Sequence, residues 1–576
     1  MNYSFSNSPT RVKIVSFFII LFAFVLVSKL FLVQVVHSSS YSERADRQYA
    51  TPSSSIFERG TIFFERKDGQ LVSAATQVSG FKLTIDPTKI ANKEDAYDAL
   101  SKVVPLDEVD FLTKASKSKD VYEELAHRLT KEQADAISKL KISGVSIFKE
   151  KWRFYPGENI ASHVLGFVGY KGDELGGRYG LERQFDGNLS QDKNSPYVNF
   201  FAEVFSNIKD TLFKSEEHSG NIVTTIEPVV ADILEKKLEE VKSRYSATSV
   251  GGIIMNPQDG SIYAMSVKPD FDPNNFSKVE KTSTFSNPLV ENVFEFGSVV
   301  KPLVMAAGLD TGVVTAGTTY DDKGSVTVEK KIINNFDKKA RGVVDMQEVL
   351  GQSLNTGMVF VYQKLGKQRM HDYMMAFGIG EETGIDLPNE TSGLVSNLTS
   401  NLKNARAIEY TNASFGQGIA LTPIEMVRAL ASLGNGGNLV TPHVVKSIKY
   451  DTGLEKKFTY ETKPTKISAE TGEEITRMLV KVLDKSLSEG KQKMEHYSIA
   501  VKTGTAQVAK DGGGGYYEDK HMHSFFGYFP AHDPKFIVFL YAIDPRGVLY
   551  ASQTWTTPFL DITKFLLNYY EVPPDR

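Results

Sequence analysis

The sequence predicts an α+β protein with a single N-terminal transmembrane helix. Three features of the chain lead to this fold class: an apolar run at residues 14–36, a mixed region over residues 37–220, and a C-terminal part whose strand hairpins enclose a helical middle. Hairpin strands at both ends with helices between them are typical of a sheet that is covered by helices.

Composition limits the classes of protein to which this chain can belong. Its 576 residues suggest roughly two to four domains, and a content of 41% hydrophobic residues excludes wholesale disorder. A formal net charge of −4 argues against a nucleic-acid binder that relies on bulk charge. The chain contains no cysteine, which excludes disulfides, cysteine-ligated zinc, Fe–S clusters and thiol nucleophiles.

Residues 14–36 form the expected membrane anchor. As a helix these 23 residues would reach about 34 Å, which is enough to cross a bilayer. Arg11 and Lys13 precede the apolar run and favour a cytoplasmic tail at residues 1–13. A cleaved signal peptide is the alternative, but residues 35–37 make a poor small-residue cleavage site, which favours an uncleaved anchor.

Residues 37–220 are expected to form a separate domain that mixes short strands with helices. A β-like piece at residues 80–85 precedes a helical, charged stretch around residues 92–140. Two segments, residues 58–69 and 153–182, are rich in glycine and charge. Neither has metal-ligand spacing or pairs a nucleophile with a base, so we interpret them as turns and packing salt bridges.

Residues 221–576 are expected to form one α+β domain. The expected strands are residues 221–226, 250–255, 261–265, 499–506, 524–529 and 536–541. The expected helices run from Pro228 to Val241, through most of residues 295–435 and 468–488, and over residues 555–571. The short connections between the strands favour antiparallel neighbours.

The first motif with chemical content is Ser298-x-x-Lys301. If a helix begins at Ser298, the spacing of three places the hydroxyl and the amine on one face, and Pro302 fits only near such a helix start. A neutral lysine beside a serine is a competent base, and the positive helix end favours an oxyanion. Alone, this spacing is a weak signal that occurs by chance in many proteins.

The second motif is Ser353-x-Asn355. Asp345 begins a short helical pattern that Gly351 breaks, so we expect Ser353 and Asn355 in an extended loop between helices, where both side chains can face one site. On its own the motif also fits an ordinary turn.

The third motif is Lys502-Thr503-Gly504-Thr505 on an apolar strand. Gly504 would let a substrate backbone approach the strand, and Lys502 and Thr503 offer a cation and a hydroxyl suited to a carboxylate. On its own the motif also fits a surface strand with one lysine.

Together, in this order and at separations of 55 and 149 residues, the three motifs resemble the set found in penicillin-binding proteins and serine β-lactamases. The segments at residues 58–69 and 155–182 extend the resemblance to class B, monofunctional penicillin-binding proteins along nearly the whole chain. Two positions depart from the family pattern: Phe296 stands where proline is usual, and Glu65 where aspartate is usual. Neither departure removes a chemical group from the expected site.

The resemblance implies a serine-type peptidoglycan D,D-transpeptidase with no cofactor and no metal. Ser298 is expected to attack the penultimate D-Ala carbonyl of a stem peptide, with Lys301 as the general base. Ser353 is expected to relay the proton to the leaving amine, and Asn355 to hold Lys301 and the substrate amide. The expected substrate-binding residues are Lys502, Thr503, Gly504 and Thr505, with the N–H groups of Ser298 and Thr505 forming an oxyanion hole.

The resemblance also implies the domains and the partners. An elongated, β-rich pedestal domain at residues 37–220 would carry a transpeptidase domain at residues 221–576, with an antiparallel sheet, flanking helices and a helical subdomain. The chain would lie in the cell membrane with its N-terminus inside and its catalytic domain outside the cytoplasm. Its partners would be peptidoglycan stem peptides, β-lactams as covalent inhibitors, a SEDS-type glycan polymerase and other divisome or elongasome proteins, with no nucleic acid.

Several functional alternatives remain open at this stage. The short N-terminal tail and modest length favour a role in cell division over an elongation role in cell shape. A β-lactamase would leave half of the chain unexplained, and a bifunctional enzyme would need an additional glycosyltransferase domain. A scaffold that activates a polymerase with little catalysis of its own is the alternative from a different class.

Overall fold

The computed structural model describes residues 58–171, 174–190, 219–399, 405–450, 452–510 and 515–576, together with Phe17, Leu21 and Phe22. Apart from those three residues, the predicted tail at residues 1–13 and the predicted anchor at residues 14–36 lie outside the described part. Within that part, no helix is both long and apolar enough to span a bilayer. The described chain divides into two compact units: residues 79–152 form unit 1, and Glu58–Val78 with Arg153–Arg576 form unit 2.

Unit 1 is a small α+β unit. Its elements are the end of β2 (Leu71–Ile85), α3 (Lys93–Ser101), α4 (Glu108–Ala115), β3 (Glu123–Leu129), α5 (Lys131–Leu140) and β4 (Val145–Phe154). β3 and β4 both pair with β2, and Leu83, Leu100 and Phe111 lie in its buried core. The predicted strand at residues 80–85 is confirmed, whereas the predicted helical stretch contains β3 between its helices.

Unit 2 contains a sheet that joins distant parts of the chain. Its strands run in the order β16 (Glu455–Lys457), β15 (Val445–Tyr450), β7 (Gly220–Thr224), β1 (Ile62–Glu65) and the start of β2. The same unit also contains the hairpin of β5 (Val168–Lys171) and β6 (Glu174–Gly177) and the short helices α6 (Ser162–Leu165), α7 (Gly180–Gln184) and α8 (Asp186–Leu189). β1 pairs with β7 in parallel, and the paired residues Ile62 and Ile222 are 160 positions apart in the sequence. The pairing therefore ties the start of the described chain to the segment that begins at residue 219.

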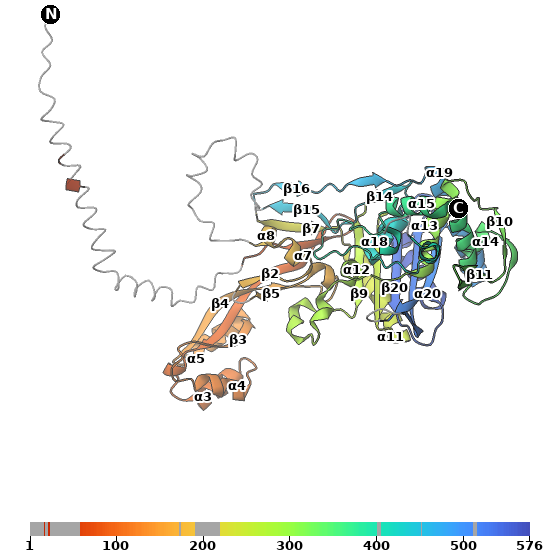
Figure 1. The fold of residues 1–576 in the computed structure, drawn as a ribbon. Helices are drawn as coiled ribbons and strands as arrows, with labels where there is room; N and C mark the ends of the chain where they lie inside the picture. The colour runs from red at the N-terminus through yellow and green to blue at the C-terminus, as the bar shows by residue number, and fades with distance from the viewer. Residues whose placement is uncertain are drawn as a thin grey trace, which may run out of the picture. The chain divides into compact units, whose positions relative to one another are not determined.

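A second, five-stranded antiparallel sheet forms the centre of unit 2. Its strands run in the order β18 (Ala500–Ala509), β19 (Tyr516–Phe529), β20 (Phe536–Ile543), β8 (Ser249–Met255) and β9 (Ile262–Lys268). The predicted hairpin of β8 and β9, the three predicted C-terminal strands and their antiparallel pairing are all confirmed. The sheet unites strands from both ends of the predicted C-terminal domain (Figure 1).

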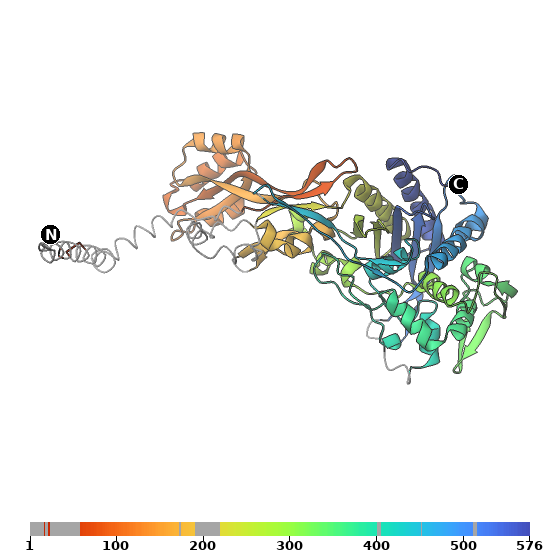
Figure 2. The same ribbon diagram turned by 90° about the horizontal axis from the view of Figure 1, so that it is seen from above.

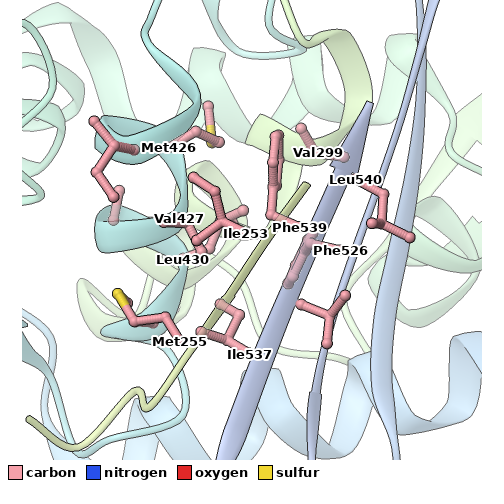
Figure 3. Close-up of a cluster of buried hydrophobic side chains, with 14 of the residues drawn as sticks. Ile253, Met255, Val299, Met426, Val427, Leu430, Phe526, Ile537, Phe539 and Leu540 are labelled. Carbon is pink, nitrogen blue, oxygen red and sulfur yellow. The ribbon is translucent and has the colours of Figure 1, made fainter. Parts of the chain in front are cut away.

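Helices cover both faces of this sheet (Figure 2). On β19 the side of Phe525 and Gly527 meets Phe559 of α20 (Ala551–Tyr569), while Tyr528 on the other side bonds Thr476 of α19 (Ala469–Lys481). This alternation follows from the period of two in a strand. Figure 3 shows Ile253 and Met255 of β8 packed with Met426, Val427 and Leu430 of α18 (Pro423–Ala431).

The remaining elements of unit 2 are mostly helical. The helices are α11 (Pro228–Tyr245), α12 (Pro288–Glu291), α13 (Lys301–Asp310), α14 (Met346–Gly351), α15 (Asn355–Ala376), α16 (Ser396–Thr399) and α17 (Ala407–Ala413). β14 (Asn438–Val440) pairs with β17 (Thr462–Pro464). The predicted helices that begin at Pro228 and that close the chain are both confirmed as α11 and α20.

The predicted helical middle is interrupted by four short strands. They are β10 (Thr319–Asp322), β11 (Ser325–Val328), β12 (Lys331–Asn334) and β13 (Gly342–Asp345), paired as β10 with β13 and β11 with β12. The expectation of mostly helical structure is wrong for this segment. β-branched residues are frequent in β11, β12 and β13, which favours strands. Gly324 and Gly342 adopt positive φ, which glycine does without strain.

The predicted boundary between residues 220 and 221 lies within unit 2. One hydrophobic core contains Ile62, Tyr155 and Leu189 from before that boundary together with Ile253 and Phe539 from after it. The segments on either side of residue 220 are therefore packed as one body, and the boundary itself stays a prediction.

Candidate active site

Ser298 and Lys301 lie on a tight turn that leads into α13. Gly297 has a φ of 62°, residues Gly297–Val300 form a 3-10 turn, and α13 begins at Lys301 with Pro302 in its first turn. The structure therefore places a 3-10 turn where the sequence suggested a helix start. Ser298 is half-buried, whereas Lys301 is fully buried.

Ser353 and Asn355 lie where α14 ends and α15 begins. Asp345 caps α14 by accepting a hydrogen bond from the N–H of Glu348, as the sequence suggested. Ser353 has a φ of 58°, and Asn355 is the first residue of α15. The expectation of an extended loop is wrong here, because the chain reverses through a left-handed residue, which is uncommon for a non-glycine side chain.

In the part of the chain that the structure describes, this turn supplies the polar contacts of the Lys301 amine. Its Nζ lies 2.6 Å from the Ser353 carbonyl oxygen, 2.7 Å from Asn355 Oδ1 and 3.2 Å from Ser353 Oγ. Among the described residues, the Ser298 hydroxyl makes no hydrogen bond with Lys301. Catalytic hydrogen bonds in unliganded sites are often long and tighten when substrate binds.

Lys502 reaches the same serine from β18. Its Nζ donates to Ser353 Oγ at 2.9 Å and to the carbonyl oxygen of Thr503 at 3.0 Å. The Ser353 hydroxyl therefore lies between two buried amines, although the three residues are widely separated in the sequence. The structure brings together Lys301, Ser353, Asn355 and Lys502.

Burial controls the charge of both lysines. Burial, and secondly repulsion from Lys502, hold the pKa of the Lys301 amine well below its usual value. Burial lowers the pKa of Lys502 to about 7. Neither amine forms an ion pair with a carboxylate in the described part of the chain, so one of the two neighbours is expected to give up its proton first, and that is Lys301.

This arrangement can move a proton along a short path. A neutral Lys301 amine donates its two N–H groups to the Ser353 carbonyl and Asn355 Oδ1, which leaves a lone pair for the Ser353 hydroxyl. Ser353 Oγ can at the same time accept from a protonated Lys502. The site therefore combines a neutral base, a relay hydroxyl and a cation, which is the chemistry needed to activate a serine without histidine.

Gly504 and Thr505 pack against the turn that carries Ser298. A Cβ on Gly504 would lie 2.4 Å from the carbonyl oxygen of Phe296, so the glycine permits a close approach of the nucleophile segment. Thr505 Oγ1 accepts a hydrogen bond from the N–H of Ala551 at 3.1 Å. Thr503 alternates with Lys502 along β18 and is half-buried, while Lys502 is fully buried.

Sequence reasoning missed two supports of this site. Ser524 Oγ donates to the carbonyl oxygen of Phe296 at 3.0 Å and fixes the approach to Ser298. Asn355 Nδ2 donates to the carbonyl oxygen of Asn334 at 2.9 Å, which turns its Oδ1 toward Lys301. A serine on a strand and a backbone carbonyl carry no sequence signal of this role. No cluster of metal-ligating side chains occurs among the described residues.

Comparisons with known proteins agree with this geometry. Residues 250–562 match the family model of the penicillin-binding protein transpeptidase domain, and residues 57–225 match that of the penicillin-binding protein dimerisation domain. Stage V sporulation protein D of Bacillus subtilis is 29% identical, over 87% of this chain and 77% of the relative. Peptidoglycan D,D-transpeptidase FtsI of Escherichia coli K12 is 26% identical, over 84% of this chain and 78% of the relative.

Solved structures share the fold. Penicillin-binding protein 2X of Streptococcus thermophilus matches with a TM-score of 0.71 and 19% identity, over 90% of this chain and 81% of that chain. Penicillin-binding protein 3 of Mycobacterium tuberculosis, complexed with aztreonam, matches with a TM-score of 0.67 and 20% identity, over 90% and 98%. Because the transpeptidase model covers more than half of the chain and the dimerisation model precedes it, the chain belongs to the class B penicillin-binding proteins.

Proposed function

We propose that this chain cross-links peptidoglycan as a serine-type D,D-transpeptidase, with Ser298 as the nucleophile. The observation that carries the proposal is the position of Ser353 Oγ between the amines of Lys301 and Lys502. Relatives named peptidoglycan D,D-transpeptidase support the substrate class. β-Lactams are then expected to act as covalent inhibitors.

The first half-reaction forms an acyl-enzyme. Ser298 Oγ attacks the carbonyl of the penultimate D-Ala while Lys301 takes the hydroxyl proton. The new C–O bond gives a tetrahedral oxyanion, which the backbone N–H groups of Ser298 and Thr505 stabilise. Ser353 passes a proton to the leaving amine as the C–N bond breaks, and the terminal D-Ala departs.

The second half-reaction transfers the acyl group to an amine of a neighbouring stem peptide. The amine loses its proton to the same base, attacks the ester carbonyl and releases Ser298. Before the terminal D-Ala leaves in the first half-reaction, Lys502 and Thr503 bind its carboxylate, and Asn355 holds Lys301 and the donor amide. Every proton is returned, so the cycle needs no cofactor.

The test of the nucleophile is covalent labelling with penicillin. We expect one β-lactam adduct on the wild-type chain and none on Ser298→Ala, as measured by intact-mass spectrometry. Ser325→Ala, an exposed serine of the same unit, is the matched control and should label normally. An adduct on Ser298→Ala would show that another residue is acylated.

The membrane placement rests on the predicted anchor at residues 14–36. The full-length protein is expected to resist carbonate extraction from membranes, and a truncated chain starting near residue 45 to be soluble. A mature N-terminus near residue 38 would instead identify a cleaved signal peptide.

We further propose that the chain works in cell division beside a SEDS-type glycan polymerase. The FtsI names among its relatives support this role over elongation. A fluorescent fusion is expected at the division site. The second candidate is a scaffold that activates the polymerase, in which case Ser298→Ala would support growth as well as the wild type does.

A further inference from the structure

We propose that Asp322, Asn335 and Thr356 are positioning residues that hold Asn355 and the Ser353 turn against the Lys301 amine. The inference rests on the proposed function, because it assigns a task in the acylation step to a buried polar network outside the three motifs. All three side chains are buried, with 1%, 1% and 5% of their surfaces exposed.

The network begins at the N-terminus of α15. Leu354, the residue before the helix, has no side chain that can cap it. Asn335 supplies the cap from another segment: its Oδ1 accepts the N–H of Thr356 at 3.2 Å. The carbonyl of Asn334, one residue earlier, accepts Asn355 Nδ2 at 2.9 Å. Two consecutive residues of one segment therefore hold two consecutive residues of the helix start.

Asp322 fixes the orientation of the Asn335 amide. Both carboxylate oxygens of Asp322 lie 3.0 Å from Asn335 Nδ2, and Oδ1 accepts the Thr356 hydroxyl at 2.7 Å. An ionised carboxylate only accepts hydrogen bonds, so the amide must point Nδ2 toward Asp322 and Oδ1 toward α15. The N–H groups of Gly324 and Arg341 also donate to this carboxylate.

The consequence reaches Lys301 through one more side chain. Because Asn355 Nδ2 is held by Asn334, its Oδ1 is left to accept from the Lys301 amine at 2.7 Å. The same helix start fixes the left-handed turn whose carbonyl is the second acceptor of that amine. These two fixed acceptors take both N–H groups of a neutral Lys301 amine, which leaves its lone pair to accept a proton.

A merely structural role would not require these groups. Burying a charged carboxylate costs stability unless it is fully hydrogen-bonded, and apolar residues of similar volume often pack as well. What a satisfied polar network adds is a single orientation of its members. In this site the network orients Asn355 Oδ1 and the Ser353 carbonyl, the two acceptors of the Lys301 amine.

The test exchanges the hydrogen-bond donor and acceptor between Asp322 and Asn335. In the full-length protein, Asp322→Asn should lower the limiting acylation rate by a fluorescent penicillin about 10–100-fold, because a small misplacement of a catalytic group has this effect. Asn335→Asp should do the same, since two carboxylates would then face each other. The double variant Asp322→Asn/Asn335→Asp reverses donor and acceptor and should recover most of the rate.

Thr356 gives a second, milder test. Thr356→Val removes the hydroxyl without changing the side-chain volume and should slow acylation several-fold, while Thr356→Ser keeps the hydroxyl and should retain the rate. Thr327→Val, at an exposed position on β11, is the matched control for the same chemical change. The noncovalent dissociation constant for the penicillin should change less than the limiting rate in each variant.

The outcomes separate this inference from the proposed function. If the wild type is not acylated at Ser298, the proposed function fails. Thermal unfolding shows whether the single variants are folded. If the wild type is acylated and the folded single variants keep its acylation rate, the positioning role is wrong. It is also overturned if the reversed pair is as slow as the single variants, or if losses only follow the fraction of unfolded protein.

Discussion

Two buried charge clusters in unit 2 have opposite compositions. In the first, Glu182 accepts from Arg59 Nε at 2.5 Å and from Arg153 Nε at 2.6 Å. In the second, the amines of Lys301 and Lys502 share the Ser353 hydroxyl, and neither amine pairs with a carboxylate among the residues that the structure describes. All of these charged side chains are almost fully buried.

The difference appears in the pKa values. Burial alone would raise the pKa of Glu182, but the charges of Arg153 and Arg59 hold it below its usual value. Burial lowers the pKa of Lys502 to about 7, and burial together with the neighbouring charge of Lys502 holds the pKa of Lys301 well below its usual value. At similar burial, a group that is paired with an opposite charge stays ionised, whereas an unpaired amine loses its proton more easily and can act as a base.

Exchanging each lysine for arginine should give the largest effect on the reactive cluster. Lys301→Arg cannot supply a neutral base near neutral pH and should lower the acylation rate about 10²–10⁴-fold. Lys502→Arg keeps a cation and should retain part of the rate, with loss from altered geometry. The measurement is stopped-flow acylation with a fluorescent penicillin.

These two variants control for each other, because both place a guanidinium in the same buried site. Equal acylation rates for Lys301→Arg and Lys502→Arg would mean that the base has been assigned to the wrong lysine.

Removing the carboxylate of the paired cluster should mainly affect stability. Glu182→Gln leaves buried Arg153 without an ion-pair partner among the described residues and leaves Arg59 with Asp186 alone. This change should lower the free energy of unfolding by about 3–5 kcal/mol. The measurement is denaturant unfolding. Glu240→Gln, at an exposed site on α11, is the matched control and should change stability by less than about 0.5 kcal/mol. A loss at Glu182 no larger than at Glu240 would remove the contrast between the clusters.

Removing the charge of Lys502 should change the free energy of unfolding in the opposite direction to Glu182→Gln. Lys502→Met should raise the free energy of unfolding by about 1–4 kcal/mol below pH about 7, because a buried ammonium no longer has to be desolvated. The pKa of Lys502 is about 7 in the folded chain and 10.5 ordinarily, so wild-type stability rises with pH across that window. The gain should therefore shrink between pH about 7 and about 10.

Unfolding of both proteins at pH about 6 and about 9 tests this. A gain that is the same at both pH values, or a loss at pH about 6, would contradict an unpaired buried charge at Lys502.

The residues of the lysine cluster could be proposed from the sequence because they lie in short motifs. Ser298 and Lys301 are three residues apart, and Ser353 and Asn355 are two apart, so local spacing carried the information. The paired cluster has no such spacing, since Arg59 and Glu182 are 123 residues apart. The sequence supported only the general interpretation of packing salt bridges there, which the structure confirms.

Other features depend on tertiary packing and could not be read locally. The strands around Asp322 and Asn335 are four residues long, too short for their alternation to be distinguished from a helical pattern. The residue with positive φ in the turn at Ser353 is the serine itself and not a glycine, so the sequence does not indicate the turn. The sequence also allowed Lys502 to be the one lysine of a surface strand, but the turn between α14 and α15 lies against it and it is fully buried.

The smallest expected effect concerns the proton on Lys502. If its amine binds the carboxylate of penicillin, acylation should require the protonated form, which is lost as pH rises through about 7. Lys301 has the opposite requirement, so the rate itself is expected to follow a bell-shaped pH profile. A methyl ester of the same penicillin lacks the carboxylate but uses the same base. Dividing the acylation rate of the free acid by that of the ester cancels the contribution of Lys301. This ratio should fall about threefold between pH about 6.5 and about 7.5. A ratio that is constant over this range would show that the charge of Lys502 does not hold the carboxylate.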